Sequence, residues 1–105
     1  MSRLCERSAL PSEGACAFQV DGRDIIVIST AEGPRAFLNV CPHQGRSLDF
    51  APGEFLFSSS GQLICPHHGA CFDPASGECI DGPCKGDRLT PLNVTERDGA
   101  LWLDA

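Results

Sequence analysis

The chain contains the stretch Cys16-Ala17-Phe18-Gln19-Val20-Asp21-Gly22-Arg23-Asp24-Ile25-Ile26-Val27-Ile28, in which two apolar runs flank an Asp-Gly pair. Such a pair is a strong signal for a tight β-hairpin, because the central residues of the turn need positive φ and glycine adopts it without strain. The sequence therefore predicts two antiparallel strands, one on each side of the pair. The run Ile25–Ile28 has the length of a strand and is far shorter than the ~20 residues of a membrane span.

Further short runs of β-forming residues follow along the chain, separated by turn residues. The strands expected from them are Arg35–Val40, Gln62–Cys65, Leu92–Thr95 and Ala100–Leu103, the last two joined around Arg97-Asp98-Gly99. The 11 glycines and 8 prolines among 105 residues punctuate these runs, and no segment keeps helical spacing of apolar residues for three turns. The sequence predicts an all-β fold, an antiparallel β sandwich or small barrel, as a single domain over residues 1–105.

Two segments, Cys41-Pro42-His43 and Cys65-Pro66-His67-His68, each place a thiolate and an imidazole in one tight turn. The 21 residues between His43 and Cys65 are enough for a strand, a turn and a return strand, so two ligand-bearing loops can face each other. The region from Val40 to about Lys85 holds five of the seven cysteines and all three histidines. We expect this region, about 40–85, to be a loop-rich subdomain that binds a metal cluster on the β scaffold.

The mixed pairs point to iron chemistry. A Cys₂His₂ set with one Cys and one His in each loop is the ligand arrangement of a [2Fe–2S] centre in which two imidazoles replace two thiolates on one iron. Structural zinc bound by the same residues is the chemical rival, but zinc fingers usually pair Cys with Cys and His with His. A cysteine nucleophile with a histidine base would not explain the duplicated motif. Spacing alone leaves His67 and His68 as competing candidates for the second imidazole.

The motif Cys41-Pro-His43-Gln-Gly45, followed by Cys65-Pro-His-His68-Gly69-Ala-Cys-Phe-Asp73 and later by Gly82-Pro83, resembles the Rieske family. The resemblance implies a second pair of the form Cys-x-x-His, which selects His68. It therefore implies one [2Fe–2S] cluster per chain, held by Cys41, His43, Cys65 and His68. It also implies that the segment around Gly82-Pro83-Cys84 is the proline loop that covers the cluster.

Two differences from other Rieske proteins indicate the subfamily that this chain resembles. High-potential Rieske proteins of respiratory complexes have a disulfide between the loops, where this chain has Arg46 and His67, and a serine and a tyrosine where it has Ala70 and Phe72. The chain is thus similar to small Rieske-type ferredoxins. That resemblance implies a monomeric one-electron carrier, and not an enzyme, that relays electrons from a flavin-dependent reductase to a terminal oxygenase.

Composition excludes other classes of function. With 8 basic and 14 acidic residues the net charge is −6, which disfavours binding to nucleic acid or to an anionic membrane. A redox-sensing or regulatory [2Fe–2S] module and a zinc-stabilised binding domain remain as alternative functions. The N-terminus shows no export signal, so a cytoplasmic protein is expected. In a reducing cytosol the further cysteines, Cys5, Cys16, Cys71, Cys79 and Cys84, are expected to be free thiols.

Overall fold

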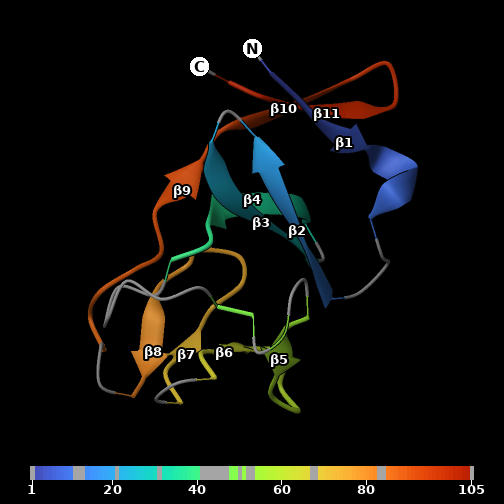
Figure 1. The fold of residues 1–105 in the computed structure, drawn as a ribbon. Coiled ribbons are helices and arrows are strands. Elements are labelled where there is room, and N and C mark those ends of the chain that lie inside the picture. Colours follow the sequence, from blue (N-terminus) through green and yellow to red (C-terminus); the bar gives the residue numbers. More distant parts are fainter. Residues whose placement is uncertain are drawn as a thin grey trace.

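The computed structural model of the chain describes residues 2–10, 14–20, 22–30, 32–40, 48–49, 51, 54–66, 69–82 and 85–104. These residues form short β-strands and one 3-10 turn, η1 (Arg7–Ala9), and contain no α-helix (Figure 1). Nowhere in these ranges is there a helix with the length and apolar character needed to cross a membrane. The all-β class predicted from the sequence is confirmed.

The strands form antiparallel sheets in three layers. The first sheet has the order β1 (Ser2–Glu6), β11 (Ala100–Leu103), β10 (Val94–Arg97). The second has the order β2 (Gly14–Val20), β3 (Arg23–Thr30), β4 (Gly33–Leu38), β9 (Pro91–Leu92). The third has the order β5 (Leu56–Phe57), β6 (Leu63–Ile64), β7 (Cys71–Phe72), β8 (Cys79–Asp81).

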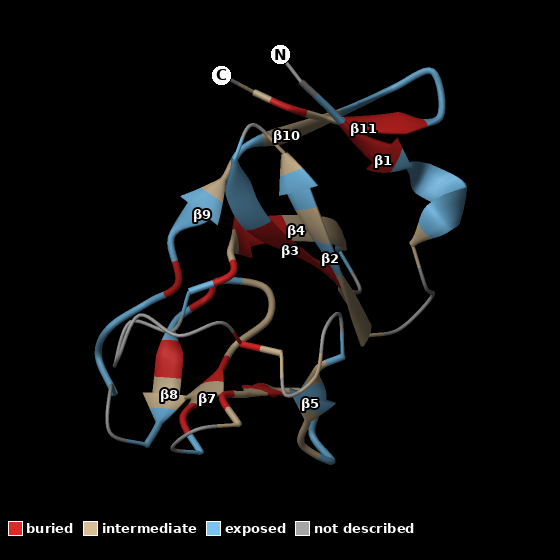
Figure 2. Cartoon of the chain, in the orientation of Figure 1, coloured by how far each residue is buried: buried red, intermediate tan, exposed pale blue. Residues whose placement is uncertain are grey.

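Strand β3 is buried on both faces. Ile25 and Val27 belong to a core shared with the first sheet, whereas Ile26 and Ile28 belong to a core shared with the third. Alternate side chains of a strand point to opposite faces, so this apolar run supplies both cores at once. Figure 2 shows buried residues gathered along β3, between the two outer layers. The second sheet is therefore the central layer of the fold.

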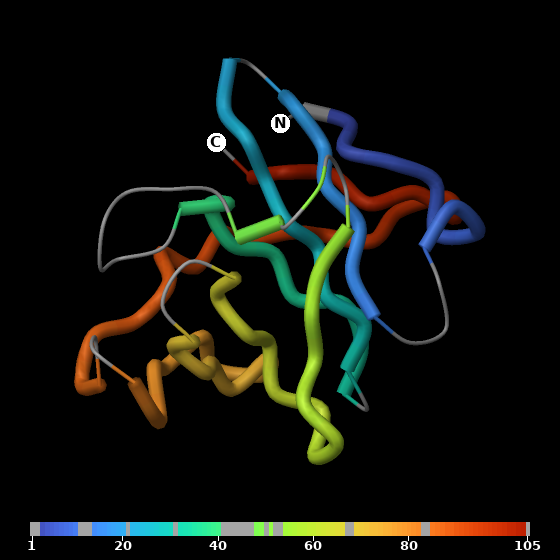
Figure 3. Tube along the Cα trace, turned by 60° about the horizontal axis from the view of Figure 1, so that its bottom comes forward, coloured from blue at the N-terminus to red at the C-terminus, as the bar shows by residue number. Residues whose placement is uncertain are grey.

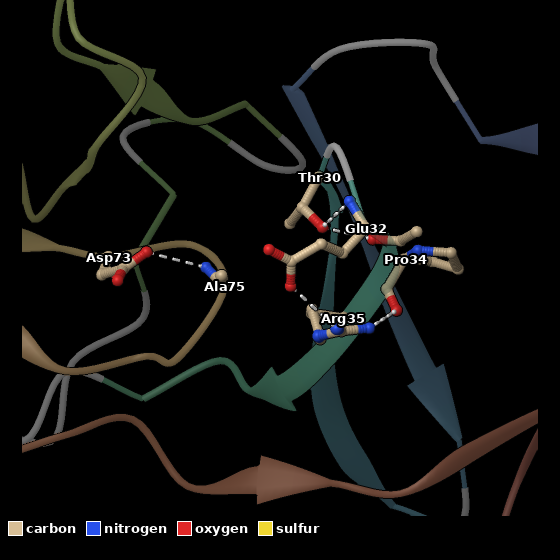
Figure 4. Close-up of polar contacts among 7 residues, drawn as sticks. Thr30, Glu32, Pro34, Arg35, Asp73 and Ala75 are labelled. Atoms are coloured by element: carbon tan, nitrogen blue, oxygen red, sulfur yellow. Dashed lines mark hydrogen bonds and ion pairs between the residues drawn. The ribbon is translucent and has the colours of Figure 1, made fainter.

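The predicted first hairpin is present. Val20 pairs with Arg23 across a two-residue turn, and Gly22 has the positive φ of +76° that such a turn requires. Asp21 lies outside the described residues. The next turn, from β3 to β4, is held by Thr30, whose hydroxyl donates to the Gly33 carbonyl at 2.6 Å and accepts from the Glu32 N–H at 3.2 Å (Figure 4).

The predicted strand Leu92–Thr95 is divided between two sheets. Pro91 and Leu92 pair with β4, and the chain then crosses at Asn93 to form β10, which pairs with β11. Pro91 has no N–H to donate, so its strand can occupy only an edge, and β9 is an edge strand. The hairpin between β10 and β11 has the predicted turn, with Asp98 and Gly99 at φ of +52° and +76°.

Strand β1 was not predicted, because its residues show no apolar alternation. It pairs with β11 from Ser2 opposite Leu103 to Glu6 opposite Ala100, which brings the two ends of the chain together (Figure 1). The side chains of Leu4 and Cys5 are buried in the core under the first sheet. Burial raises the pKa of the Cys5 thiol; nearby Cys16 adds to this effect and Arg3 opposes it.

The third sheet occupies part of the region predicted to be rich in loops. That prediction is correct in that its strands are only two or three residues long, too short for a period of two to show in the sequence. The expected strand Gln62–Cys65 corresponds to β6. Seen from another side, the segment that contains β5 runs beside β2 and β3 (Figure 3), where Phe55 and Phe57 pack against the shared core.

We predict that Cys5 reacts slowly with iodoacetamide at neutral pH, because it is buried and its raised pKa keeps the thiol protonated. Half-buried Cys16 should react faster, and unfolding in urea should make the two rates similar. Peptide mass spectrometry of timed samples measures both rates. Equal rates for Cys5 and Cys16 in the folded protein would contradict the docking of β1.

Since the folded state disfavours the Cys5 thiolate, the free energy of unfolding should also fall as pH rises above the ordinary thiol pKa of about 8.5.

Candidate metal centre

Of the four predicted ligands, only Cys65 lies among the described residues. Cys41, His43 and His68 lie outside them, as does the competing His67. Cys65 directly follows β6 and is 1% exposed. Within the described ranges no cluster of three His, Cys, Asp or Glu side chains could hold a metal ion, so no rival metal site is found there.

The second ligand loop, residues 65–70, is closed by two backbone hydrogen bonds. The Cys65 N–H donates to the Ala70 carbonyl at 2.7 Å, and the Gly69 N–H donates to the Cys65 carbonyl at 2.9 Å. Gly69 has φ of +75°, a conformation in which other residues are strained, which explains glycine directly after the histidines. The loop joins β6 to β7, whose residues Ile64 and Cys71 pair at its base. Cys65 is therefore held at a fixed place at the end of a hairpin.

Apolar residues surround Cys65. The core that contains it includes Leu63, Ala70, Phe72 and Cys79, none more than 1% exposed. A sulfur ligand at this position would be shielded from water by the apolar core.

The first ligand loop is closed by a side chain that the sequence analysis missed. Asn39, only 5% exposed, accepts a hydrogen bond through Oδ1 from the N–H of buried Leu48 at 2.8 Å. Its own N–H donates to the carbonyl of Asp24, at the start of β3, at 2.9 Å. The residues between Asn39 and Leu48 include Cys41 and His43. The available signal was a polar residue inside the apolar run Phe37-Leu38-Asn39-Val40.

Further cysteines lie near the second loop and in the scaffold. Cys5, Cys16 and Cys71 have free thiols, and the Cys79 thiol donates to the Asp81 carbonyl at 3.2 Å. Cys84 lies outside the described residues.

Comparison with known families agrees with this geometry. The family model for the Rieske [2Fe–2S] domain matches residues 1–96. The chain belongs to the Rieske family. A [2Fe–2S] cluster is thus its cofactor, and such a cluster accepts and donates one electron at a time. No curated protein sequence matches the chain.

Solved structures share this Rieske fold. The ferredoxin of carbazole 1,9a-dioxygenase from Nocardioides aromaticivorans IC177 superposes with a TM-score of 0.78 at 24% identity, covering 96% of this chain and 93% of that one. The Sphingomonas yanoikuyae B1 ferredoxin gives 0.76 at 24% identity, covering 98% and 96%. A chain from the reduced complex between oxygenase and ferredoxin in carbazole 1,9a-dioxygenase gives 0.83 at 14% identity, but the match covers 96% of this chain and only 27% of that one.

The donor set of the Rieske chain fits the cluster. Two thiolates and two imidazoles are the ligands that such a centre takes, and the sequence offers them in two loops. The one predicted ligand that the structure describes, Cys65, is shielded from water and held by backbone hydrogen bonds.

We predict that Asn39→Ala accelerates loss of the cluster, because it removes the acceptor that closes the first loop and leaves the buried Leu48 N–H without it, a cost of about 1–3 kcal/mol. Asn39→Asp keeps an acceptor oxygen and should lose the cluster more slowly than Asn39→Ala. Bleaching of the visible absorbance in a chelator measures the rate. The control is Asn93→Ala, at an exposed asparagine between β9 and β10. Equal rates in the two alanine variants would refute a role for Asn39.

Proposed function

We propose that the chain is a ferredoxin that relays single electrons from a flavin-dependent reductase to a terminal oxygenase. The proposal rests on the share of each matched structure that this chain covers. The chain spans more than nine-tenths of two ferredoxins of the same fold but only 27% of a chain from the complex of oxygenase with ferredoxin. The Rieske family model matches residues 1–96 of its 105 residues.

The proposed ligands are Cys41, His43, Cys65 and His68, in a cluster-binding part at about 40–85 of a single domain. The burial of Cys65 and the closure of its loop support one of the four directly. His68 is preferred over His67 because the sequence resembles the Cys-x-x-His form of the second pair. In this assignment the two thiolates offset the charge of one iron, the neutral imidazoles bind the other, and the apolar core around Cys65 excludes water from that side.

The proposed acceptor is a terminal oxygenase. Support comes from the solved complex of oxygenase with ferredoxin in carbazole 1,9a-dioxygenase, one chain of which contains the fold of this protein. The flavin-dependent reductase is proposed from the resemblance of the sequence to ferredoxins of oxygenase systems.

Surface charge suits a basic partner. Four arginines, in β1, η1, β4 and beside the third sheet, form ion pairs with glutamates at 3.2–3.8 Å: Arg3–Glu6, Arg7–Glu96, Arg35–Glu32 and Arg88–Glu78. These pairs are exposed and each contributes little to stability. Each pair cancels one carboxylate against one guanidinium, so the net charge stays at −6, from 8 basic and 14 acidic residues. This excess of carboxylates favours docking against a positively charged surface.

Single replacements test the ligand set. Cys41→Ser, His43→Ala, Cys65→Ser and His68→Ala should each abolish the cluster, whereas His67→Ala, the matched control, should keep about two irons and two acid-labile sulfides per chain. Metal and sulfide analysis with visible absorbance measures the outcome. Loss of the cluster in His67→Ala with retention in His68→Ala would reverse the assignment. One zinc with no sulfide in the unaltered protein would indicate a zinc domain.

Reconstitution tests the relay. With a flavin reductase and a terminal oxygenase from the same organism, the chain should be reduced by the first and reoxidised by the second. The bimolecular rate of oxygenase reduction should fall as salt rises, because the Debye length is already only ~10 Å at 0.1 M. Stopped-flow absorbance measures both steps. A rate that increases with salt would exclude a basic docking surface, and failure to reduce the oxygenase would exclude this acceptor.

A further inference from the structure

Gly82 makes an unusually close backbone contact with the second ligand loop. It directly follows β8 and has φ of +99°. A Cβ atom at this position would lie 2.6 Å from Cα and 3.2 Å from N of Ala70. Both are backbone atoms, so no change of rotamer could relieve the overlap. The absence of a side chain at residue 82 is thus what allows the end of β8 to lie against the loop.

Ala70 transmits this contact to Cys65. It is fully buried, and its carbonyl accepts the hydrogen bond from the Cys65 N–H at 2.7 Å. The Gly69 N–H is bonded in turn to the Cys65 carbonyl, so backbone hydrogen bonds join Cys65 to both Gly69 and Ala70. A displacement of Ala70 therefore displaces Cys65.

Gly82 is itself held in place from two sides. Its N–H donates to Oδ1 of Asp81 at 2.9 Å, and its carbonyl accepts from the Lys85 N–H at 3.2 Å. The buried Cys79 thiol fixes the preceding carbonyl, that of Asp81, at 3.2 Å. Since neither surface can yield easily, an added atom between them would cause strain in the loop.

We propose that Gly82 is a positioning residue, whose missing side chain sets the distance between the end of β8 and the second ligand loop and thereby places Cys65 for cluster binding. This inference rests on the assignment of Cys65 as a ligand in the proposed function. Glycine is thus needed at residue 82 for more than its positive φ, because the contact with Ala70 leaves no space for a side chain.

The decisive comparison is Gly82→Ala with Gly86→Ala. Gly86 has nearly the same φ, +101°, but a Cβ there would meet nothing within 4 Å. Both variants therefore place alanine at a similar positive φ, and only Gly82→Ala adds the overlap with Ala70. We expect Gly82→Ala to shift the reduction potential and the electron paramagnetic resonance g-values, and to lose its cluster in a chelator about tenfold faster or more. Gly86→Ala should keep the potential and g-values of the unaltered protein. Equal behaviour of the two variants would overturn the proposal.

A second pair of variants serves if Gly82→Ala does not fold. Asp81→Ala and Asp81→Asn both remove the charge of an exposed side chain, but only Asp81→Ala removes the acceptor that orients Gly82. We expect faster cluster loss and shifted g-values in Asp81→Ala alone, with far-UV circular dichroism unchanged in both. Identical cluster properties in these two variants would overturn the proposal.

The outcomes separate this proposal from the proposed function. If Cys65→Ser retains the cluster, the ligand assignment fails and the inference about Gly82 fails with it. If Cys65→Ser abolishes the cluster while Gly82→Ala and Gly86→Ala are alike, only the role of Gly82 fails.

Discussion

The burial of β3 on both faces is the constraint on which the rest of the structure depends. Ile25 and Val27 fill one core, and Ile26 and Ile28 fill the other. Since a shift of one residue in the pairing of a strand exchanges its two faces, the register of β3 with β2 and β4 fixes both cores together. The same strand supports the cluster region, because the carbonyl of Asp24, at its start, receives the N–H of Asn39 at the base of the first ligand loop.

The two ligand loops are held by different kinds of interaction. At the base of the first loop, the Asn39 side chain bonds to the backbone of Leu48. In the second, backbone hydrogen bonds close the loop and the bare backbone of Gly82 lies against Ala70. A side-chain hydrogen bond thus closes the first segment, whereas the second depends on a position that has no side chain.

Much of the scaffold could be predicted from the sequence, because long apolar runs and Asp-Gly turns express local preferences. The β2–β3 and β10–β11 hairpins and the all-β class are of this kind. Strands β5, β7 and β8 are too short to show a period, and β1 forms because the distant β11 offers it a partner. The motif identified the family and the cofactor, but Asn39 and the contact of Gly82 depend on residues far apart in the chain. Only the folded structure brings those residues together.

The pairing of Ser2 with Leu103 has a consequence for how this fold can be used in larger proteins. Both ends of the chain leave the molecule side by side, at the pole opposite the third sheet and its ligand loop (Figure 1). A domain whose ends meet can be inserted into a loop of another protein without being stretched or opened. The insertion would leave the third sheet, at the opposite pole, free of the junction. The solved structures that share the fold include a small ferredoxin, of which it covers 93%, and a larger chain, of which it covers 27%.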